Sequence, residues 1–262
     1  MNSKKNKSWK RRISAFILGL LVLPAVLMLQ SLMSTAVYMI SGKAPSLEVN
    51  AVPITLVLIV IVGSWYRFET GRKICPFQTF GRLGKDTISL IEIGIGAQGI
   101  STLMMIAIQI LLPKTMETYE ELIGTSGMGT MSLPIIVYTI LLAPVVEELI
   151  FRGIILHYFE KAGCTFWIAN ILQAVLFGIY HLNLAQGICA GMIGILIGYV
   201  ARKYNALTVG IFLHMIFNMW GYLLMTLGDA GRLSGVVFLL EIVFVVHGLD
   251  GIKNGNVKKL LN

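Results

Sequence analysis

The sequence predicts an all-α protein, a polytopic bundle of about eight transmembrane helices with both termini in the cytoplasm. Three observations lead to this fold class. Hydrophobic residues make up 56% of the 262 positions and charged residues only 13%, against about 25% charged residues in a typical soluble domain. Apolar runs close to the roughly 20 residues that a spanning helix needs recur from end to end. Basic residues gather at every second connection between these runs.

The predicted spans follow the apolar runs in order. They cover residues 13–40, 51–66, 87–112, 133–157, 165–182, 186–201, 206–226 and 235–249. The first span follows a basic tail, as a signal peptide does, but its apolar run exceeds the 7–15 residues of a signal-peptide core. We therefore interpret it as an uncleaved first transmembrane helix.

Positive charges mark one side of the predicted bundle. Lysines and arginines lie in the tail before the first span, in the connection 67–86, and after the fourth, sixth and eighth spans. The opposite connections hold Lys43, Lys114 and Arg232 against Glu48, Glu117, Glu120, Glu121 and Asp229. This alternation predicts an even number of spans and a multi-pass protein of the cell membrane. The net charge of +8 then reflects topology and contact with the lipid bilayer, and we expect no nucleic-acid partner because no basic patch is interleaved with aromatic residues.

We divide the chain into three regions. Residues 1–125 form an N-terminal transmembrane region, residues 126–230 a catalytic core, and residues 231–262 the last helix with a basic tail. Glycines in the sixth span, Gly187, Gly191, Gly194 and Gly198, share one helix face and predict close packing against a neighbouring helix. The three cysteines, Cys75, Cys164 and Cys189, form no C-x-x-C pair, which argues against a disulfide framework or a cysteine metal site.

Charged residues inside a span are candidates for function because the bilayer disfavours them. The fourth span carries Glu147, Glu148 and Arg152. Glu148 and Arg152 are four residues apart, so they share a helix face and are predicted to pair. Glu147 is rotated by about 100° from Glu148 and has no evident partner within the helix. Pro144 is expected to kink the helix just before these residues.

Two more polar pairs lie on other spans. Phe177 and His181 are four residues apart near the end of the fifth span, and His214 and Asn218 are four apart in the seventh. Taken singly, each pair is also explained by hydrogen bonds between helices. Counted along the helices, His181 falls near the non-cytoplasmic end of its span while Glu147 and His214 fall near mid-depth. Convergence therefore requires the fifth span to tilt, to start deeper, or to face a water-filled vestibule.

Taken together, these side chains suit hydrolysis. A carboxylate and a histidine can remove the proton of a water that attacks a carbonyl, and a second imidazole and an amide can stabilise the oxyanion. One glutamate and two histidines are also the ligand set of some zinc peptidases. A zinc ion held by Glu147, His181 and His214 therefore stays open. We expect metal-independent glutamate/histidine chemistry, since the chain has no H-E-x-x-H zinc helix.

The motifs E-E-x-x-x-R at 147–152, F-x-x-x-H at 177–181 and H-x-x-x-N at 214–218 resemble those of the CPBP intramembrane protease family. That family includes Rce1-type CAAX prenyl endopeptidases and bacterial Abi and bacteriocin-immunity proteins. The resemblance covers roughly residues 130–225, and the first three spans resemble nothing that identifies them.

The resemblance implies an intramembrane endopeptidase acting on a membrane-associated protein or peptide, including prenylated CAAX-type substrates. Glu147 and His181 would activate water, and His214 and Asn218 would stabilise the oxyanion. Three further residues would have supporting roles: Glu148 and Arg152 would fix the fourth span, and Phe177 would shape the site.

Two other functions remain as alternatives from the sequence. A non-catalytic immunity or scaffolding protein of the same family would use the bundle to bind a partner. A proton-coupled transporter would use intramembrane Glu and His as a relay, but the polar residues lie in one half of the chain, without matching broken helices in two halves.

Overall fold

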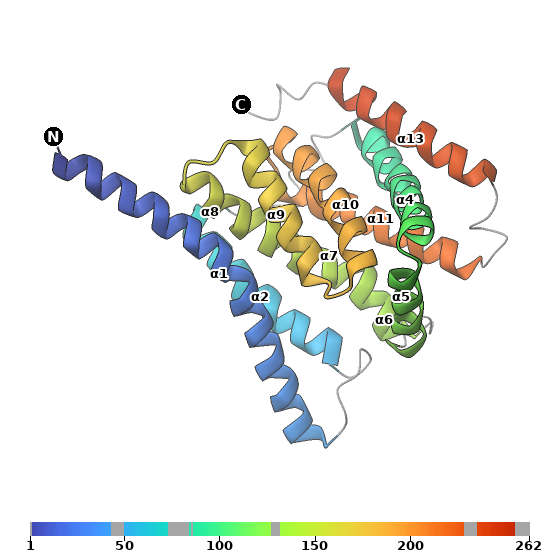
Figure 1. The fold of residues 1–262 in the computed structure, drawn as a ribbon, viewed down its shortest axis with the longest axis horizontal. Helices are drawn as coiled ribbons and strands as arrows, with labels where there is room; N and C mark the ends of the chain where they lie inside the picture. Colours follow the sequence, from blue (N-terminus) through green and yellow to red (C-terminus); the bar gives the residue numbers. More distant parts are fainter. Residues whose placement is uncertain are drawn as a thin grey trace.

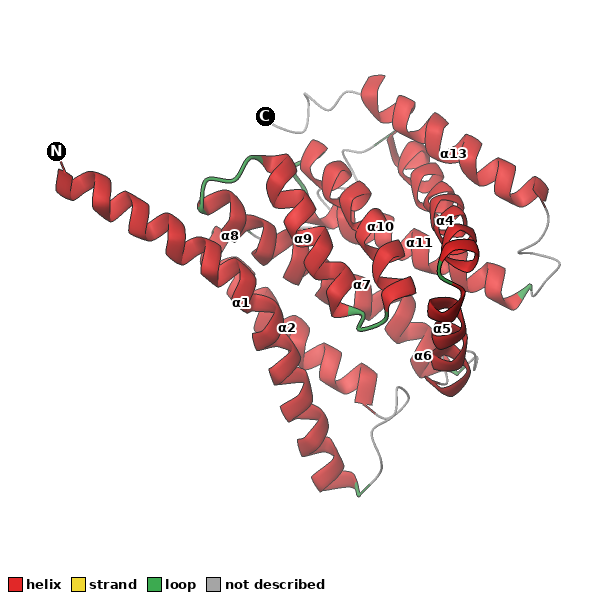
Figure 2. Cartoon of the chain, in the orientation of Figure 1, coloured by secondary structure: helices red, strands yellow, loops and turns green. Residues whose placement is uncertain are grey.

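The structure is a computed structural model, and it describes residues 2–42, 50–72, 84, 86–126, 132–227 and 235–254. The described residues are helical with short connections and contain no strand (Figure 2). Seven helices among them are long and apolar enough to cross a membrane. The predicted all-α, multi-pass fold is therefore confirmed, while the cytoplasmic location of the termini stays a prediction.

Each predicted span corresponds to a helix or to a continuous run of helices. The single helices are α1 (Asn2–Ser41), α2 (Val52–Thr70), α4 (Asp86–Leu111), α9 (Phe166–Tyr180), α10 (Leu184–Lys203), α11 (Leu207–Thr226) and α13 (Gly235–Asn254). The fourth span is the run α6 (Leu133–Val137), η2 (Tyr138–Leu142), α7 (Ala143–Glu148), η3 (Leu149–Ile155) and α8 (Leu156–Lys161). Cys75 and several connection charges used for topology (Lys43, Glu48, Arg82, Lys85, Asp229, Arg232, Lys258, Lys259) lie outside the described residues.

Two elements differ from a set of eight full spans. Helix α9 has 15 residues, about 22 Å at 1.5 Å per residue, which is shorter than the hydrocarbon core of about 30 Å. Helix α5 (Pro113–Ser126) was predicted as part of a connection. Its mixture of polar and apolar residues resembles a loop by composition, although Pro113 opens it at a position that favours a helix start.

The fourth span widens at two places into π-helical turns, η2 and η3. Pro144 lacks a backbone N–H, and the wide turn η2 ends directly before Ala143 and Pro144. Single-turn π segments inside α-helices are frequent at functional sites. Here the irregularities flank the segment Ala143–Glu148, which carries both glutamates.

The fourth span is packed between helices from both halves of the chain. Helices α1 and α2 contact η3 and its neighbours on one side, α9 also packs against η3, and α11 packs against η2 and α7. Figure 1 shows α1 and α2 on one flank of the bundle and the α4/α13 pair on the other. The N-terminal helices thus support the segment that carries Glu147.

Glycines set the closest helix contacts. All four glycines of the predicted α10 seam face α9: a Cβ at Gly187 would lie 2.7 Å from the Gly178 oxygen, and the others approach Ala174, Phe177 and Asn170. The predicted packing face is therefore confirmed. Because Gly178 and Gly187 let α9 and α10 approach closely, the short turn between them holds His181 against the bundle.

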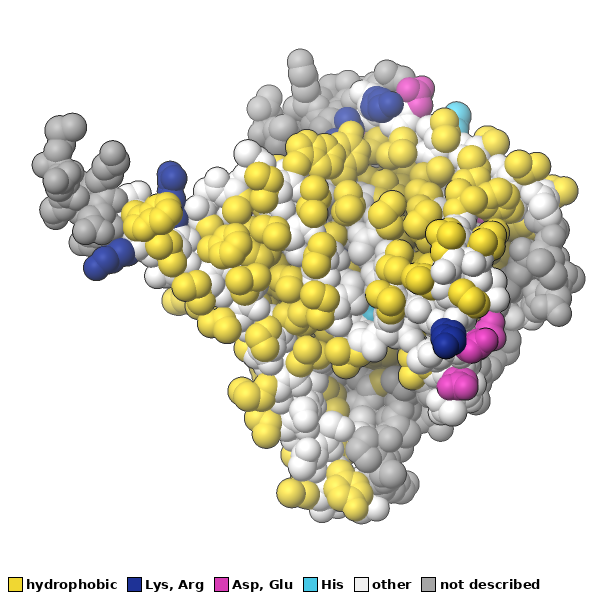
Figure 3. All heavy atoms as spheres, viewed as in Figure 1, with side chains coloured by type: hydrophobic (Ala, Val, Ile, Leu, Met, Phe, Trp, Pro, Cys, Tyr) yellow, Lys and Arg dark blue, Asp and Glu magenta, His cyan; other side chains and the backbone are white. Residues whose placement is uncertain are grey.

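Apolar side chains are spread across the visible face of the described residues, and charged side chains lie toward its edges (Figure 3). Many large apolar residues, such as Ile110, Leu133 and Val175, are exposed. A soluble protein rarely exposes a continuous apolar area of this kind. Together with the seven spanning helices, this surface identifies an integral multi-pass membrane protein.

Candidate active site

Three parts of the bundle bring the motif residues together. Glu147 and Glu148 end α7, and Arg152 lies in η3. Phe177 is in the last turn of α9, and His181 follows that helix directly as its C-cap. His214 and Asn218 lie in the middle of α11. Helix α9 has only 15 residues, and its last turn lies beside the middle of α11, where the Phe177 ring contacts that of His214.

Glu148 is the centre of the charged cluster and is fully buried. Its Oε1 accepts a hydrogen bond from Arg152 Nη1 at 2.8 Å, so the predicted pair is present. The same oxygen lies 2.9 Å from His214 Nδ1. Sequence reasoning missed this second contact, since it crosses from α7 to α11. Glu148 therefore fixes the orientation of an imidazole as well as neutralising a guanidinium.

Glu147 points to the other nitrogen of the same imidazole. Its Oε2 lies 3.7 Å from His214 Nε2, too far for a direct hydrogen bond. Glu147 is only 6% exposed, and among the described residues its carboxylate has no hydrogen-bond donor. This acid is thus buried beside a histidine without the strong partner that Glu148 has.

Phe177 lies between the other motif side chains. Its ring meets the ring of His181 edge-on at 5.0 Å and that of His214 at 5.9 Å between centroids. The Arg152 guanidinium lies 4.7 Å from the centre of the Phe177 ring, a cation–π distance. Phe177 therefore contacts both histidines and the arginine, in line with the shaping role that the resemblance implies.

His181 belongs to the cluster through ring contacts. It is half-buried and packs against Phe177 and Tyr180. Within the described part of the chain, no hydrogen bond or ion pair joins His181 to Glu147. The structure thus pairs Glu147 with His214 at the shorter distance, whereas the resemblance groups Glu147 with His181.

Asn218 lies one turn beyond His214 on α11. Its Nδ2 donates to the backbone oxygen of Thr139 at 2.8 Å, and Thr139 is in the π-helical turn η2. An amide nitrogen carries two hydrogens, so one N–H remains for a ligand. The irregular turn therefore anchors the side chain that was predicted to stabilise an oxyanion.

Polar groups of α9 and α10 bind Arg152 or lie next to it. Arg152 Nη2 donates to the Gly194 oxygen at 3.1 Å, and Gln173 Nε2 reaches the same oxygen at 3.2 Å. Asn170, also fully buried, donates to the Ile195 oxygen. Sequence reasoning missed Asn170 and Gln173, although their spacing with Phe177 places all three on one face of an otherwise apolar helix.

The donor set was tested against the zinc alternative. Across the described ranges, no group of three His, Cys, Asp or Glu side chains is arranged to hold a metal ion. Glu147 and His214 approach each other, but His181 meets the cluster through Phe177. The residues as placed do not fit a three-ligand zinc site.

The fold and the site first define a class: a multi-pass membrane protein that gathers carboxylates, imidazoles and an amide inside its helical bundle. Residues 129–220 match the family model described as Rce1-like, type II CAAX prenyl endopeptidase. This segment contains all three motifs and is similar to that family, which supports the resemblance to CPBP/CAAX-type proteases. No match was found among curated proteins or among solved structures. The family supports a CAAX-type intramembrane protease function in general.

Proposed function

We propose that the protein is an intramembrane endopeptidase that hydrolyses a peptide bond in a membrane-associated protein or peptide of the cell membrane. The observation that carries the proposal is the ordered series Arg152, Glu148, His214 and Glu147, with contacts of 2.8, 2.9 and 3.7 Å. A buried acid facing an imidazole that is itself held by a carboxylate is a common arrangement for general base catalysis.

Glu147 is proposed as the general base. It takes a proton from a water molecule as the water oxygen attacks the carbonyl carbon of the scissile bond. When the tetrahedral intermediate collapses, the carbon–nitrogen bond breaks and Glu147 returns the proton to the leaving amine. Its lack of a hydrogen-bond donor in the described residues supports this role, because a carboxylate already held by strong donors is a weaker base.

His214 is proposed to stabilise the oxyanion together with Asn218. Glu148 accepts from Nδ1, so the proton on that nitrogen is committed to the carboxylate. His214 donates from Nε2 to the oxyanion when both of its ring nitrogens carry a proton. The free N–H of Asn218 is the second donor. His181, held against Phe177, is proposed to orient the attacking water with Glu147.

The substrate proposal follows from the location of these residues. The site lies within apolar helices and its acids are buried, which favours a substrate that is itself at or in the membrane. Prenylated CAAX-type peptides are the first candidates, because the matching family model is described by that activity.

A cleavage assay with purified protein in lipid nanodiscs tests the proposal. The panel contains prenylated CAAX-type peptides, the same peptides without lipid, and transmembrane peptides. Glu147→Gln is expected to lower kcat/KM by about 10²- to 10⁴-fold, the usual contribution of a general base. A wild-type chain that cleaves nothing in the panel, or a Glu147→Gln variant as active as wild type, overturns it.

The matched control is Glu241→Gln. Glu241 is also a buried acid inside a span, with 2% exposure, but it lies on α13 and binds the indole N–H of Trp220. A glutamine oxygen can accept the same hydrogen bond, so this variant is expected to retain activity. It separates loss of the base from a general effect of neutralising a buried carboxylate.

A further inference from the structure

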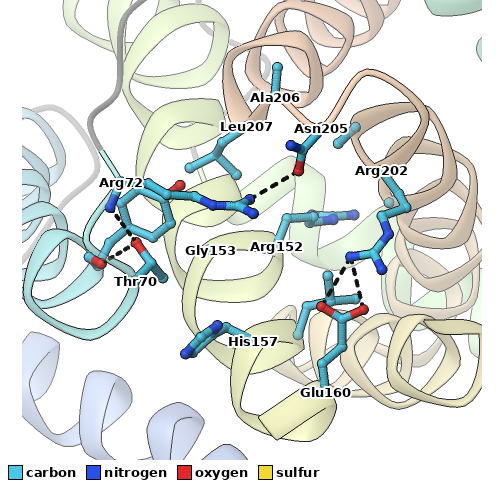
Figure 4. Close-up of a pocket in the computed structure, with 14 residues that line it drawn as sticks. Thr70, Arg72, Arg152, Gly153, His157, Glu160, Arg202, Asn205, Ala206 and Leu207 are labelled. Atoms are coloured by element: carbon cyan, nitrogen blue, oxygen red, sulfur yellow. Dashed lines mark hydrogen bonds and ion pairs between the residues drawn. The ribbon is translucent and has the colours of Figure 1, made fainter. Parts of the chain in front are cut away.

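A second polar site lies at the end of the bundle where α2, α8 and α10 meet. The cavity has a volume of about 200 Å³. Its charged and polar lining comes from Thr70, Arg72, Arg152, His157, Glu160, Arg202 and Asn205 (Figure 4). None of Glu147, His181, His214 and Asn218 lines it. By the distribution of basic residues, this end of the bundle is the predicted cytoplasmic one, at the level of the lipid headgroups.

Arg152 forms the inner wall of this cavity and is incompletely bonded. Its Nη1 binds Glu148 and its Nη2 binds the Gly194 oxygen. Its Nε is buried and has no hydrogen-bond partner in the described part of the chain. A guanidinium N–H can only donate, and a buried donor left without an acceptor is unfavourable by about 1–3 kcal/mol. An acceptor that enters the cavity would satisfy it.

Two more arginines lie at the outer end of the cavity, and they differ in their partners. Arg202 forms an ion pair with Glu160 at 2.9 Å. Arg72 donates to the Asn205 side-chain oxygen at 3.2 Å and has no carboxylate partner among the described residues. Since Glu160 balances Arg202 and Glu148 balances Arg152, the positive charge of Arg72 is left without a counter-charge.

His157 adds another unpartnered polar atom on the same wall. Its Nε2 is buried and makes no hydrogen bond within the described residues. Figure 4 shows the Arg72 side chain reaching across the mouth toward Asn205, while Arg152 lies deeper and points toward the side where Arg202 and Glu160 meet. The cavity therefore combines one excess positive charge with donors at two depths.

We propose that this cavity binds an oxyanion of the phosphate type, supplied by a phospholipid headgroup or by free phosphate. Planar guanidinium groups match the oxygens of a phosphate better than they match a monatomic anion. Arg72 supplies the uncompensated charge and Arg152 Nε the inner donor. The cavity is separate from the proposed catalytic residues, since none of them lines it, although it shares Arg152 with the charged cluster of the candidate active site.

Titration of inorganic phosphate into the full chain in phosphatidylcholine nanodiscs, at constant ionic strength, tests the site. Arg72→Gln removes the uncompensated charge without leaving a carboxylate unpaired. It is expected to weaken phosphate binding by about tenfold to a hundredfold, as for loss of a hydrogen bond to a charged group. Asn205→Asp is expected to do the same, because the new carboxylate would neutralise Arg72. Asn205 has φ 47°, a conformation that aspartate also tolerates.

The matched control is Arg67→Gln. Arg67 is an exposed arginine on the same helix end and does not line the cavity. Binding that is lost in Arg72→Gln and Asn205→Asp but retained in Arg67→Gln supports the site. Equal weakening by Arg67→Gln indicates unspecific surface attraction and overturns it.

A second arm separates the two sources of phosphate. Nanodiscs that contain phosphatidylglycerol are expected to suppress phosphate binding if the headgroup occupies the cavity, and Arg72→Gln then retains less of this lipid on purification. Undiminished binding in these discs identifies free phosphate. No phosphate binding in phosphatidylcholine discs together with no Arg72-dependent retention of lipid overturns the proposal. So does displacement of phosphate by a peptide with a free terminal carboxylate but not by its amidated form, since the cavity would then be a substrate subsite.

Discussion

The bundle buries acids in two regions, and their surroundings differ. In the motif region, Glu148 bridges Arg152 and His214, and Glu147 faces the far nitrogen of the same histidine. In the region between α11 and α13, Glu241 accepts one hydrogen bond from Trp220 Nε1 at 2.7 Å. No Lys, Arg or His forms an ion pair with Glu241 among the described residues. One region is a network of charges and the other is a single acid with a neutral donor.

This difference teaches that burial of an acid inside a span does not by itself indicate chemistry. Glu241 is as buried as Glu147, and glycines of α4 pack directly against it: a Cβ at Gly99 would lie 2.9 Å from Glu241 Cβ. Such close packing places the backbone of α4 directly against Glu241. Glu147 differs because an imidazole held in place by other charges lies beside it.

Breaking the charge network should have the largest effect on stability. Arg152→Met leaves the fully buried Glu148 without its cation, and we expect a loss of about 3–5 kcal/mol in the free energy of unfolding. Unfolding in mixed micelles measures it. Adding Glu148→Gln should restore most of the loss, because it removes the uncompensated charge and still offers an oxygen to His214 Nδ1. A double variant no more stable than Arg152→Met would contradict the network.

Glu148→Gln alone should lower both stability and activity, because the buried Arg152 then loses its counter-charge. The glutamine oxygen can still accept from His214 Nδ1, but the carboxylate that holds this imidazole is gone. We expect kcat/KM per folded molecule to fall by about 10²-fold or more. Activity normalised to the folded fraction separates this positioning role from a purely structural one. Unchanged activity per folded molecule, with less folded protein, would point to structure alone.

Much of the fold could be predicted because apolar runs and their charged ends are local properties. All eight predicted spans have a helix or helical run close to the predicted residues. Helix α5 was missed because its polar composition resembles a connection. The short α9 was taken as a full span because its sequence is apolar apart from Asn170 and Gln173. Helix α9 ends at Tyr180, shortly before Leu182 takes a positive φ of 54°, and hydropathy does not record such a change of the backbone.

The sequence predicted which residues form the candidate site better than it predicted the contacts between them. The spacing of Glu148 and Arg152 within one helix gave their ion pair. The contact between Glu148 and His214 depends on how α7 and α11 are rotated against each other, and Gly210 permits it, since a Cβ there would lie 2.9 Å from Glu148 Oε2. Spacing within one helix cannot supply such a relation. The catalytic roles of Glu147, His181, His214 and Asn218 stay predictions.

Removing the neutral donor in the second region should have a smaller effect. Trp220→Phe takes away the hydrogen bond to Glu241 while keeping an aromatic ring, and we expect about 1–2 kcal/mol of destabilisation. Peptidase activity should stay near that of wild type, because within the described residues no hydrogen bond, ion pair or ring contact joins a motif residue to Trp220 or Glu241. Micelle unfolding and the cleavage assay on one preparation measure both quantities. A loss of activity as large as that of Glu147→Gln would place the second region in the catalytic site.

Removing an exposed ion pair should have the smallest effect on stability. It also tests whether burial is what makes the Arg152–Glu148 pair important. Lys161 Nζ lies 2.9 Å from Glu69 Oε2, nearly the distance of 2.8 Å between Arg152 and Glu148. The side chain of Lys161 is 52% exposed, against 2% for Arg152. Water already solvates the exposed charges, so Lys161→Gln should lower the free energy of unfolding by less than about 1 kcal/mol. If instead it destabilises the protein as much as Arg152→Met does, burial cannot be what distinguishes the two pairs. The link between α2 and α8 would then be the feature that holds the N-terminal helices to the site.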